Sequence, residues 1–111
     1  MENSIPERDW KYLRRIKPEL LSILCRRINL SAAKILRAKE ESEHDKYIKL
    51  YKHIEESDCI IADCFNDWRR SNIRLKLHFL IHHRLLTDEQ IENLSQERKF
   101  SAKPRLLTDI K

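Results

Sequence analysis

Between Tyr47 and Trp68, hydrophobic positions recur in alternating steps of four and three residues. This spacing places the side chains on a single stripe of an α-helix. The stripe consists of Tyr47, Tyr51, Ile54, Asp58, Ile61, Phe65 and Trp68. Every member except Asp58 is aromatic or aliphatic, so the pattern predicts a helix whose stripe is covered by the rest of the fold.

Shorter patterns predict two helices before this one. Ser4 and Glu7 have the spacing of a capping box, with a proline between them, and predict a helix start. Pro18 is expected to end that helix and to begin the next one, because proline cannot donate a helical hydrogen bond. The second helix is expected to end before an acidic segment, in which Ser42 and Asp45 form another capping box.

The hydrophobic pattern also continues beyond Trp68, so it is compatible either with one long helix or with two helices separated by a break. A single helix from His44 to Arg84 would be about 60 Å long. That is nearly twice the diameter of a compact chain of this length, whose radius of gyration would be about 13 Å. We therefore predict a break near Ser71 and Asn72.

Two further elements follow the predicted break. Apolar residues spread over more than one face of residues 73–86, which predicts a helix buried between neighbours. Thr87 and Gln90 form a capping box that begins a short helix. Ser95 is expected to cap one more turn, and Pro104 is expected to end it.

Together these elements predict an all-α fold, a compact helical bundle of four main helices plus one or two short C-terminal helices. Residues 1–104 are expected to form one helical-bundle domain, and residues 105–111 a frayed C-terminal tail. The predicted core consists of Trp10, Leu13, Leu21, Leu24, Ile28, Ile35, Tyr47, Tyr51, Ile54, Ile61, Phe65, Trp68, Leu75 and Phe79.

Composition narrows the classes of function. The chain contains no glycine, which excludes the glycine-rich loops that bind nucleotide phosphates and dinucleotides. Asparagine is therefore expected at left-handed helix ends, where glycine is usual. The candidates are Asn29, Asn66, Asn72 and Asn93. The formal net charge of +5 at pH 7 permits an anionic partner without requiring one.

The three cysteines, Cys25, Cys59 and Cys64, all lie within helical patterns. Their odd number and their positions predict reduced, buried thiols of an intracellular protein rather than a disulfide framework. The chain shows no signal-peptide pattern and no apolar run of about 18 residues. We therefore expect a cytoplasmic protein with no membrane association.

Asp58 is the polar exception on the hydrophobic stripe. A buried Asp58 carboxylate would belong to a functional site with a shifted pKa, or it would pair with an arginine or a tryptophan indole and fix the helix register. Asn72 lies on the same stripe and favours the second interpretation, in which both residues form a buried polar layer.

The most basic segment of the chain runs from Trp68 to Arg84. Basic residues recur in it at steps of four, so a continuous helix would align them along one face. Such a face suits a phosphate backbone or an acidic protein surface. The alternative is a solvated face that pairs with nearby acids such as Asp63 and Asp67, and a basic segment alone does not distinguish the two. The predicted anion-binding residues are Arg69, Arg70, Arg74, Lys76, His78, His82, Arg98 and Lys99.

A helix-turn-helix over residues 88–102 is a weaker interpretation of the C-terminal part. It would place Arg98, Lys99 and Lys103 on the second of two short helices that meet near Ser95. Pro104 leaves that helix barely two turns, which is short for reading a major groove.

No metal site, cofactor site or catalytic site is predicted. His78 and His82 have helical ligand spacing, but no carboxylate or cysteine in that helix supports them. Cys59 and Cys64 are expected to point to different sides of their helix. A nucleophile elbow requires glycine. We therefore expect a protein that is not an enzyme and has no small-molecule substrate.

Three segments resemble parts of small bacterial helical proteins of similar length and uncharacterised function. They are the segments from Glu7 to Trp10, from Tyr47 to Tyr51 and from Phe65 to Ser71. The resemblance covers most of the chain. It implies a small all-helical protein, and it implies no activity and no functional residue.

The sequence therefore leaves two hypotheses about function. In the first, the chain is a non-enzymatic interaction or regulatory module that binds a protein partner, or a second copy of itself, through a helix face. An exposed Trp10 or Tyr12 would suit the anchor of such an interface. In the second, the chain binds nucleic acid through the basic segment from Arg69 to Arg84.

Overall fold

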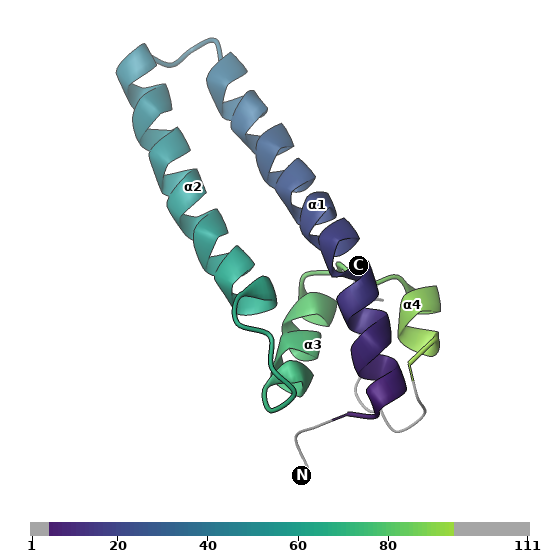
Figure 1. The fold of residues 1–111 in the computed structure, drawn as a ribbon. Helices are drawn as coiled ribbons and strands as arrows, with labels where there is room; N and C mark the ends of the chain where they lie inside the picture. Colours follow the sequence, from purple (N-terminus) through teal and green to yellow (C-terminus); the bar gives the residue numbers. More distant parts are fainter. Residues whose placement is uncertain (1–4, 95–111) are drawn as a thin grey trace.

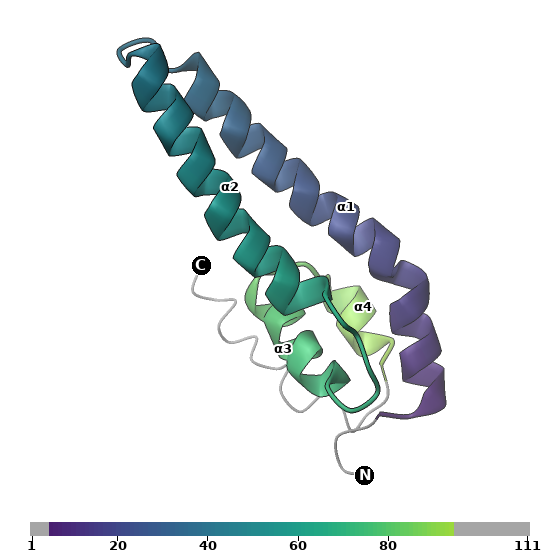
Figure 2. The ribbon, with the colours of Figure 1, turned by 60° about the vertical axis from the view of Figure 1, so that its left-hand side comes forward.

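The computed structural model describes residues 5–94, and the regular structure in this part of the chain is entirely α-helical (Figure 1). Its helices are α1 (Glu7–Arg37), α2 (Glu43–Phe65), α3 (Ile73–His82) and α4 (Asp88–Glu92), and residues 5–94 contain no strand. The α1 and α2 helices form a long antiparallel hairpin, and α3 and α4 lie at one end of it (Figures 1 and 2). The all-α prediction is confirmed.

The α1 helix is one continuous helix where the sequence predicted two. Pro18 lies inside it, so the prediction that Pro18 ends the first helix was wrong. Figure 2 shows that α1 bends along its length, as expected for a helix that loses one hydrogen bond at a proline. The helix continues because Ile16 and Leu20, on either side of the proline, are buried in one core. The N-cap is Pro6, and Ser4 of the predicted capping box lies outside the described residues.

The other two predicted helix starts are confirmed. The Ser42 side chain accepts a hydrogen bond from the Asp45 backbone N–H at 3.0 Å, where α2 begins. At the start of α4, Thr87 and Gln90 form both hydrogen bonds of a capping box. Three C-terminal predictions lie outside the described residues, namely the turn capped by Ser95, the stop at Pro104 and the tail 105–111.

The α2 helix packs against α1 through a different stripe from the predicted one. Its inward positions are Leu50, His53, Ser57 and Cys64. The His53 Nε2 atom lies 3.0 Å from the carbonyl oxygen of Ile28 on α1. Each inward position comes one residue before a predicted one, and one residue corresponds to a rotation of about 100° around a helix.

This rotation leaves the upper half of the predicted stripe in solvent. Tyr47 is 62% exposed, Tyr51 58% and Ile54 42%, so the prediction that they belong to the core was wrong. The physical reason is that α2 has only α1 to pack against at this level, and one neighbour covers one face. Nearer the hairpin's other end, Phe65 of the same stripe is buried.

The core lies where the four helices meet. Its largest fully buried hydrophobic side chains are Leu13, Leu20, Ile73, Leu77 and Leu80. Of the other predicted core residues, Leu24 and Phe65 are buried. A further set is half-buried, comprising Trp10, Leu21, Ile28, Ile35, Ile61, Trp68 and Phe79. The prediction for Leu75 was wrong, because α3 turns this residue outward and leaves it 54% exposed.

The long hydrophobic pattern is broken as predicted, but the break begins earlier than the predicted Ser71 and Asn72, so Trp68 lies in a loop and not on α2. The α2 helix ends at Phe65, and residues 66–72 connect it to α3. Lys76 of α3 reaches back to this helix end, where its Nζ atom donates to the carbonyl oxygens of Ala62 and Asp63 at 3.1 and 3.0 Å. The Ala62 carbonyl also accepts from the Asn66 backbone N–H at 3.2 Å, so Lys76 adds a second donor there and supplies a donor to Asp63 in the last turn of α2.

Left-handed backbone positions occur at two residues of the described chain, and neither is an asparagine. They are Asp67, with φ of 57°, and Arg84, with φ of 55°. The prediction that asparagine replaces glycine at such positions was therefore wrong. Asn66 and Asn93 do adjoin helix ends, but with negative φ angles.

The molecule is elongated rather than compact. The radius of gyration is 16.7 Å, against about 13 Å expected for a compact chain of this length. Its 31-residue α1 helix is about 46 Å long. We call residues 28–58, the far end of the hairpin, the arm, and we call residues 5–27 and 59–94 the base.

Candidate binding surfaces

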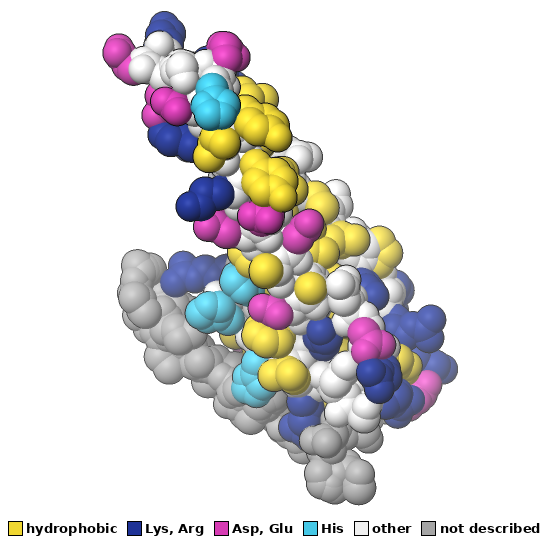
Figure 3. All heavy atoms as spheres, turned by 90° about the vertical axis from the view of Figure 1, so that its left-hand side faces the viewer, with side chains coloured by type: hydrophobic (Ala, Val, Ile, Leu, Met, Phe, Trp, Pro, Cys, Tyr) yellow, Lys and Arg dark blue, Asp and Glu magenta, His cyan; other side chains and the backbone are white. Residues whose placement is uncertain are grey.

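Exposed hydrophobic side chains are concentrated on the arm. Among residues 5–94, six of the seven large hydrophobic residues with exposed side chains lie there, and the seventh is Leu75 in the base. The six are Leu30, Leu36, Tyr47, Ile48, Tyr51 and Ile54. Figure 3 shows hydrophobic side chains following one another down the arm along α2. We call Tyr47, Tyr51 and Ile54, which share one side of α2, the arm stripe.

Acidic residues border the lower end of the arm stripe. Glu55 follows Tyr51 by four residues and Asp58 follows Ile54 by four, so each lies one turn further along α2. Both are exposed, and neither forms a salt bridge within residues 5–94. The border of the stripe is therefore negative at this end.

The exposure of Asp58 overturns the prediction of a buried polar layer. Asp58 faces solvent because this part of the stripe, from Tyr47 to Asp58, is rotated away from α1. Asn72 is half-buried in the loop before α3, where it accepts from the Arg69 backbone N–H and donates to the Asp67 carbonyl, both at 2.9 Å. Its role is to shape this loop. The carboxylate that is fully buried is Asp9, in the first turn of α1, and sequence reasoning missed it because charged residues surround it.

The predicted continuous basic face does not form. Arg70 lies in the loop before α3, so it does not extend the helical row of Arg74, His78 and His82. Lys76 is 8% exposed, and its Nζ atom already donates to two carbonyl oxygens at the end of α2. Arg98 and Lys99 lie outside the described residues.

Two of the predicted cations are paired with carboxylates. Arg69 binds Asp67 at 2.5 Å, and Arg70 binds Glu7 of α1 at 2.5 Å. The hydrogen bond from Arg69 lowers the pKa of the Asp67 carboxyl, and the hydrogen bond from Arg70 lowers that of Glu7. These pairs reduce the positive charge that the two arginines offer to an external anion.

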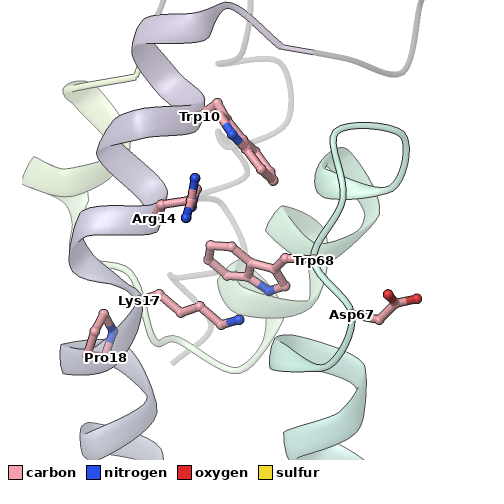
Figure 4. Close-up of a pocket in the computed structure, with 6 residues that line it drawn as sticks. All are labelled: Trp10, Arg14, Lys17, Pro18, Asp67 and Trp68. Atoms are coloured by element: carbon pink, nitrogen blue, oxygen red, sulfur yellow. The ribbon is translucent and has the colours of Figure 1, made fainter.

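Cations and aromatic rings instead gather around an open pocket between α1 and the loop that follows α2 (Figure 4). Its lining residues are Trp10, Arg14, Lys17, Pro18, Asp67 and Trp68, and its volume is about 500 Å³. The Lys17 Nζ atom lies 4.7 Å from the centre of the Trp68 ring. The guanidinium carbons of Arg14 and Arg70 lie 5.8 and 5.4 Å from the centre of the Trp10 ring. We call the pocket with these six lining residues the tryptophan pocket; Arg70 lies beside it.

Sequence reasoning missed Arg14 and Lys17 as site residues. They belong to α1, far in the sequence from the basic segment that drew attention, and the hairpin brings them to Trp68. Trp10 was predicted as an exposed anchor or a core residue, and it is half-buried at the pocket wall. The signal that was available is the spacing of Trp10, Arg14 and Lys17, which places all three on one side of a helix.

The thiols and histidines of the described residues differ in burial and are not grouped as metal ligands. Cys64 is buried, and burial raises its pKa to about 11. Cys59 is exposed and Cys25 half-buried, so the prediction of buried thiols holds fully for Cys64 alone. Burial, and then the neighbouring His82, lowers the pKa of His83. Residues 5–94 contain no group of three or more histidine, cysteine or acidic side chains placed to hold a metal ion.

Comparisons with known protein families, with curated proteins and with solved structures gave no match to this chain. The resemblance of three segments to small bacterial helical proteins therefore stays a prediction. Within the described helices, none is long and apolar enough to cross a membrane. Function has to be argued from the two surfaces, the arm stripe and the tryptophan pocket.

Proposed function

We propose that this chain is a non-enzymatic interaction module that binds a protein partner through the arm stripe. The observation that carries the proposal is the exposure of Tyr47, Tyr51 and Ile54 on one side of α2. Tyrosine supplies a large contact area and a hydroxyl group, and it is enriched at the centres of protein interfaces. Contiguous apolar surface that stays exposed in a folded chain often marks a site of interaction with another protein.

The partner that fits this surface is an amphipathic helix with basic residues beside its apolar stripe. The arm stripe has the spacing of helix-in-groove anchors, which a partner helix contacts at steps of three and four residues. Glu55 and Asp58 border the stripe without a salt bridge in the described chain, so lysine or arginine on the partner would meet them. Such border charges contribute to partner choice and to the rate of association.

The proposal is tested with a designed helical peptide that carries leucines on one stripe and lysines beside it. We expect saturable binding of the labelled peptide by fluorescence anisotropy, and loss of binding in the Tyr47→Ser and Tyr51→Ser double variant. Leu75→Ser is the matched control, because Leu75 is equally exposed but lies in the base. A peptide with glutamates in place of the lysines should bind at least tenfold more weakly.

Equal binding to the double variant, or no binding of the lysine peptide at all, would overturn the proposal. A further outcome concerns self-association. If the molecular mass in solution doubles with concentration, and the double variant abolishes this, the occupant of the arm stripe is a second copy of the chain rather than a basic helix.

A further inference from the structure

The tryptophan pocket combines two features that one class of ligand uses together. Figure 4 shows the indole rings of Trp10 and Trp68 turned into the same space, with Arg14 and Lys17 beside them on α1. The Asp67 carboxylate is turned away from the two rings. The pocket therefore offers flat apolar surfaces next to positive charge.

The ring of Trp68 is held in place from two sides. Its Nε1 atom donates to the Cys64 carbonyl oxygen at 2.8 Å. The ring also stacks on Phe65, with 6.4 Å between ring centres and 15° between ring planes. A fixed ring loses little conformational freedom when a ligand stacks on it, which favours binding.

Two of the cations are available to a ligand. Arg14 and Lys17 form no salt bridge within residues 5–94, and they lie over the tryptophan rings. A cation over an exposed ring is held weakly compared with a charge-assisted hydrogen bond to a phosphate. Both side chains can therefore turn to a phosphate and uncover the ring beneath. Arg70 differs, because Glu7 already binds it.

We propose that the tryptophan pocket binds a nucleotide unit. The base stacks on the indole of Trp68 or Trp10, and Arg14 and Lys17 bind the phosphate. Base stacking on aromatic side chains beside cations that follow the phosphates is how proteins bind single strands without reading their sequence. The pocket volume of about 500 Å³ falls within the range of small-ligand sites. An acidic peptide would satisfy the cations but would leave the two indole faces without a flat partner.

A nucleotide unit has two sources, a free mononucleotide and a single-stranded nucleic acid, and one titration separates them. Both tryptophans of the chain lie in the pocket, so selectively excited tryptophan fluorescence reports on this site. We would titrate the protein with adenosine and uridine monophosphates, with a short single-stranded RNA and with polyglutamate. We expect saturable quenching by nucleotides or RNA. Tighter binding of the RNA identifies a single strand as the source, and equal affinities identify the free nucleotide.

Variants assign the binding to named residues. Arg14→Gln with Lys17→Gln should weaken binding at least tenfold. For RNA, the double variant should also flatten the salt dependence, by a slope of about 0.7 for each phosphate that the protein no longer neutralises. Trp68→Leu should weaken binding about tenfold, consistent with the loss of one stacked base. Lys11→Gln with Arg26→Gln is the matched control, because both are exposed on α1 outside the pocket.

Three results would overturn the proposal. They are the absence of saturable quenching at low salt, unchanged affinity in the Arg14 and Lys17 double variant, and polyglutamate binding as tight as that of RNA. The last result would show that charge alone holds the ligand. Thermal unfolding monitored by circular dichroism confirms that each variant is folded, and Trp10→Leu replaces Trp68→Leu if the latter is not.

Discussion

The base and the arm use the same two helices in opposite ways. In the base, α1 buries Leu13 and Leu20 completely against the other helices. In the arm, α1 and α2 meet through half-buried positions such as Leu50 and His53, while the larger apolar side chains face solvent. Burial of apolar area is the main source of folding free energy, so the base supplies most of the stability.

The difference teaches that the most hydrophobic stripe of a helix is not always its packing stripe. On α2 the more apolar stripe, with Tyr51 and Ile54, is exposed, and the stripe with His53 and Ser57 packs. Because the base already holds the chain together, the arm can keep apolar surface free. The base supplies the stability and the arm supplies exposed apolar surface, and this difference is the reason for proposing that a partner binds the arm.

The largest expected effect is the loss of stability when the base core is truncated. Leu20→Ala should lower the free energy of unfolding by about 3 kcal/mol, because Leu20 is fully buried and its removal leaves a cavity. Tyr51→Ala in the arm should lower it by less than about 1 kcal/mol. Urea denaturation followed by circular dichroism measures both. Equal losses would mean that the arm is as important for stability as the base.

Thiol reactivity gives a second contrast between a buried and an exposed position. At pH 8 a thiol with a pKa of about 11, as in Cys64, has about one hundredth of the thiolate of one with the reference value of 9.0. Cys59 is exposed and Cys64 is buried with a raised pKa, so in single-cysteine variants Cys59 should react with a disulfide reagent much faster than Cys64. Rapid reaction of Cys64 would show that the base opens readily.

The same thiol predicts a loss of stability at alkaline pH. The pKa of Cys64 is higher in the folded chain than the reference value of 9.0, so the folded state binds its proton more tightly. The contribution of the protonated Cys64 thiol to the free energy of unfolding is fully present below pH 9. It is lost as the pH rises from 9 to about 11. Cys64→Ala should therefore show a shallower fall in stability over this range, and the exposed Cys59→Ala is the control.

Lys76 tests the contribution of a polar contact in the base. Lys76→Met keeps most of the side chain but removes both hydrogen bonds to the carbonyl oxygens at the end of α2. We expect a loss of about 1–2 kcal/mol, because the Asp63 carbonyl loses the donation from Lys76 while the Ala62 carbonyl keeps only the donation from the Asn66 N–H. Lys49→Met is the control in the arm, where the partly exposed pair with Glu41 should be worth less than about 1 kcal/mol. A smaller loss of unfolding free energy for Lys76→Met than for Lys49→Met would mean that this contact in the base contributes less than the exposed pair in the arm.

The smallest expected effect concerns the exposed pair of Glu7 and Arg70. The hydrogen bond from Arg70 lowers the pKa of Glu7 below 4.5. The pair therefore stabilises the fold above that pH, and the contribution is lost as the pH falls through the lowered value. In Arg70→Gln, the pKa of Glu7 measured by NMR should rise towards 4.5, with little change in stability at neutral pH. An unchanged pKa would show that the two side chains do not pair in solution.

Local features of the fold were predictable from the sequence, and tertiary ones were not. The helix starts at Ser42 and Thr87 depend on hydrogen bonds within a few residues, so their patterns were sufficient. Pro18 lies within a helix because distant residues bury the side chains around it. The direction in which α2 faces depends on which neighbours exist at each level, and periodicity alone does not contain that information.

The same distinction holds for the candidate sites. The arm stripe was visible as a pattern, but its exposure was not. The tryptophan pocket joins Arg14 and Lys17 of α1 to Trp68 beyond the end of α2. Only the hairpin brings these residues together, and the densest charge in the sequence lay elsewhere.

The contact between Arg8 and Asn93 has a consequence for how the protein is made. The Arg8 side chain donates to the Asn93 carbonyl oxygen at 2.6 Å. The first turn of α1 therefore makes a contact that forms only after a residue near the end of the described chain has been synthesised. A ribosome adds about 5–20 residues each second. The two long helices can therefore pair soon after they emerge, whereas Leu13 and Leu20 wait seconds for α3 and α4. During that interval the apolar side chains of the base are uncovered, and such surface is prone to aggregate.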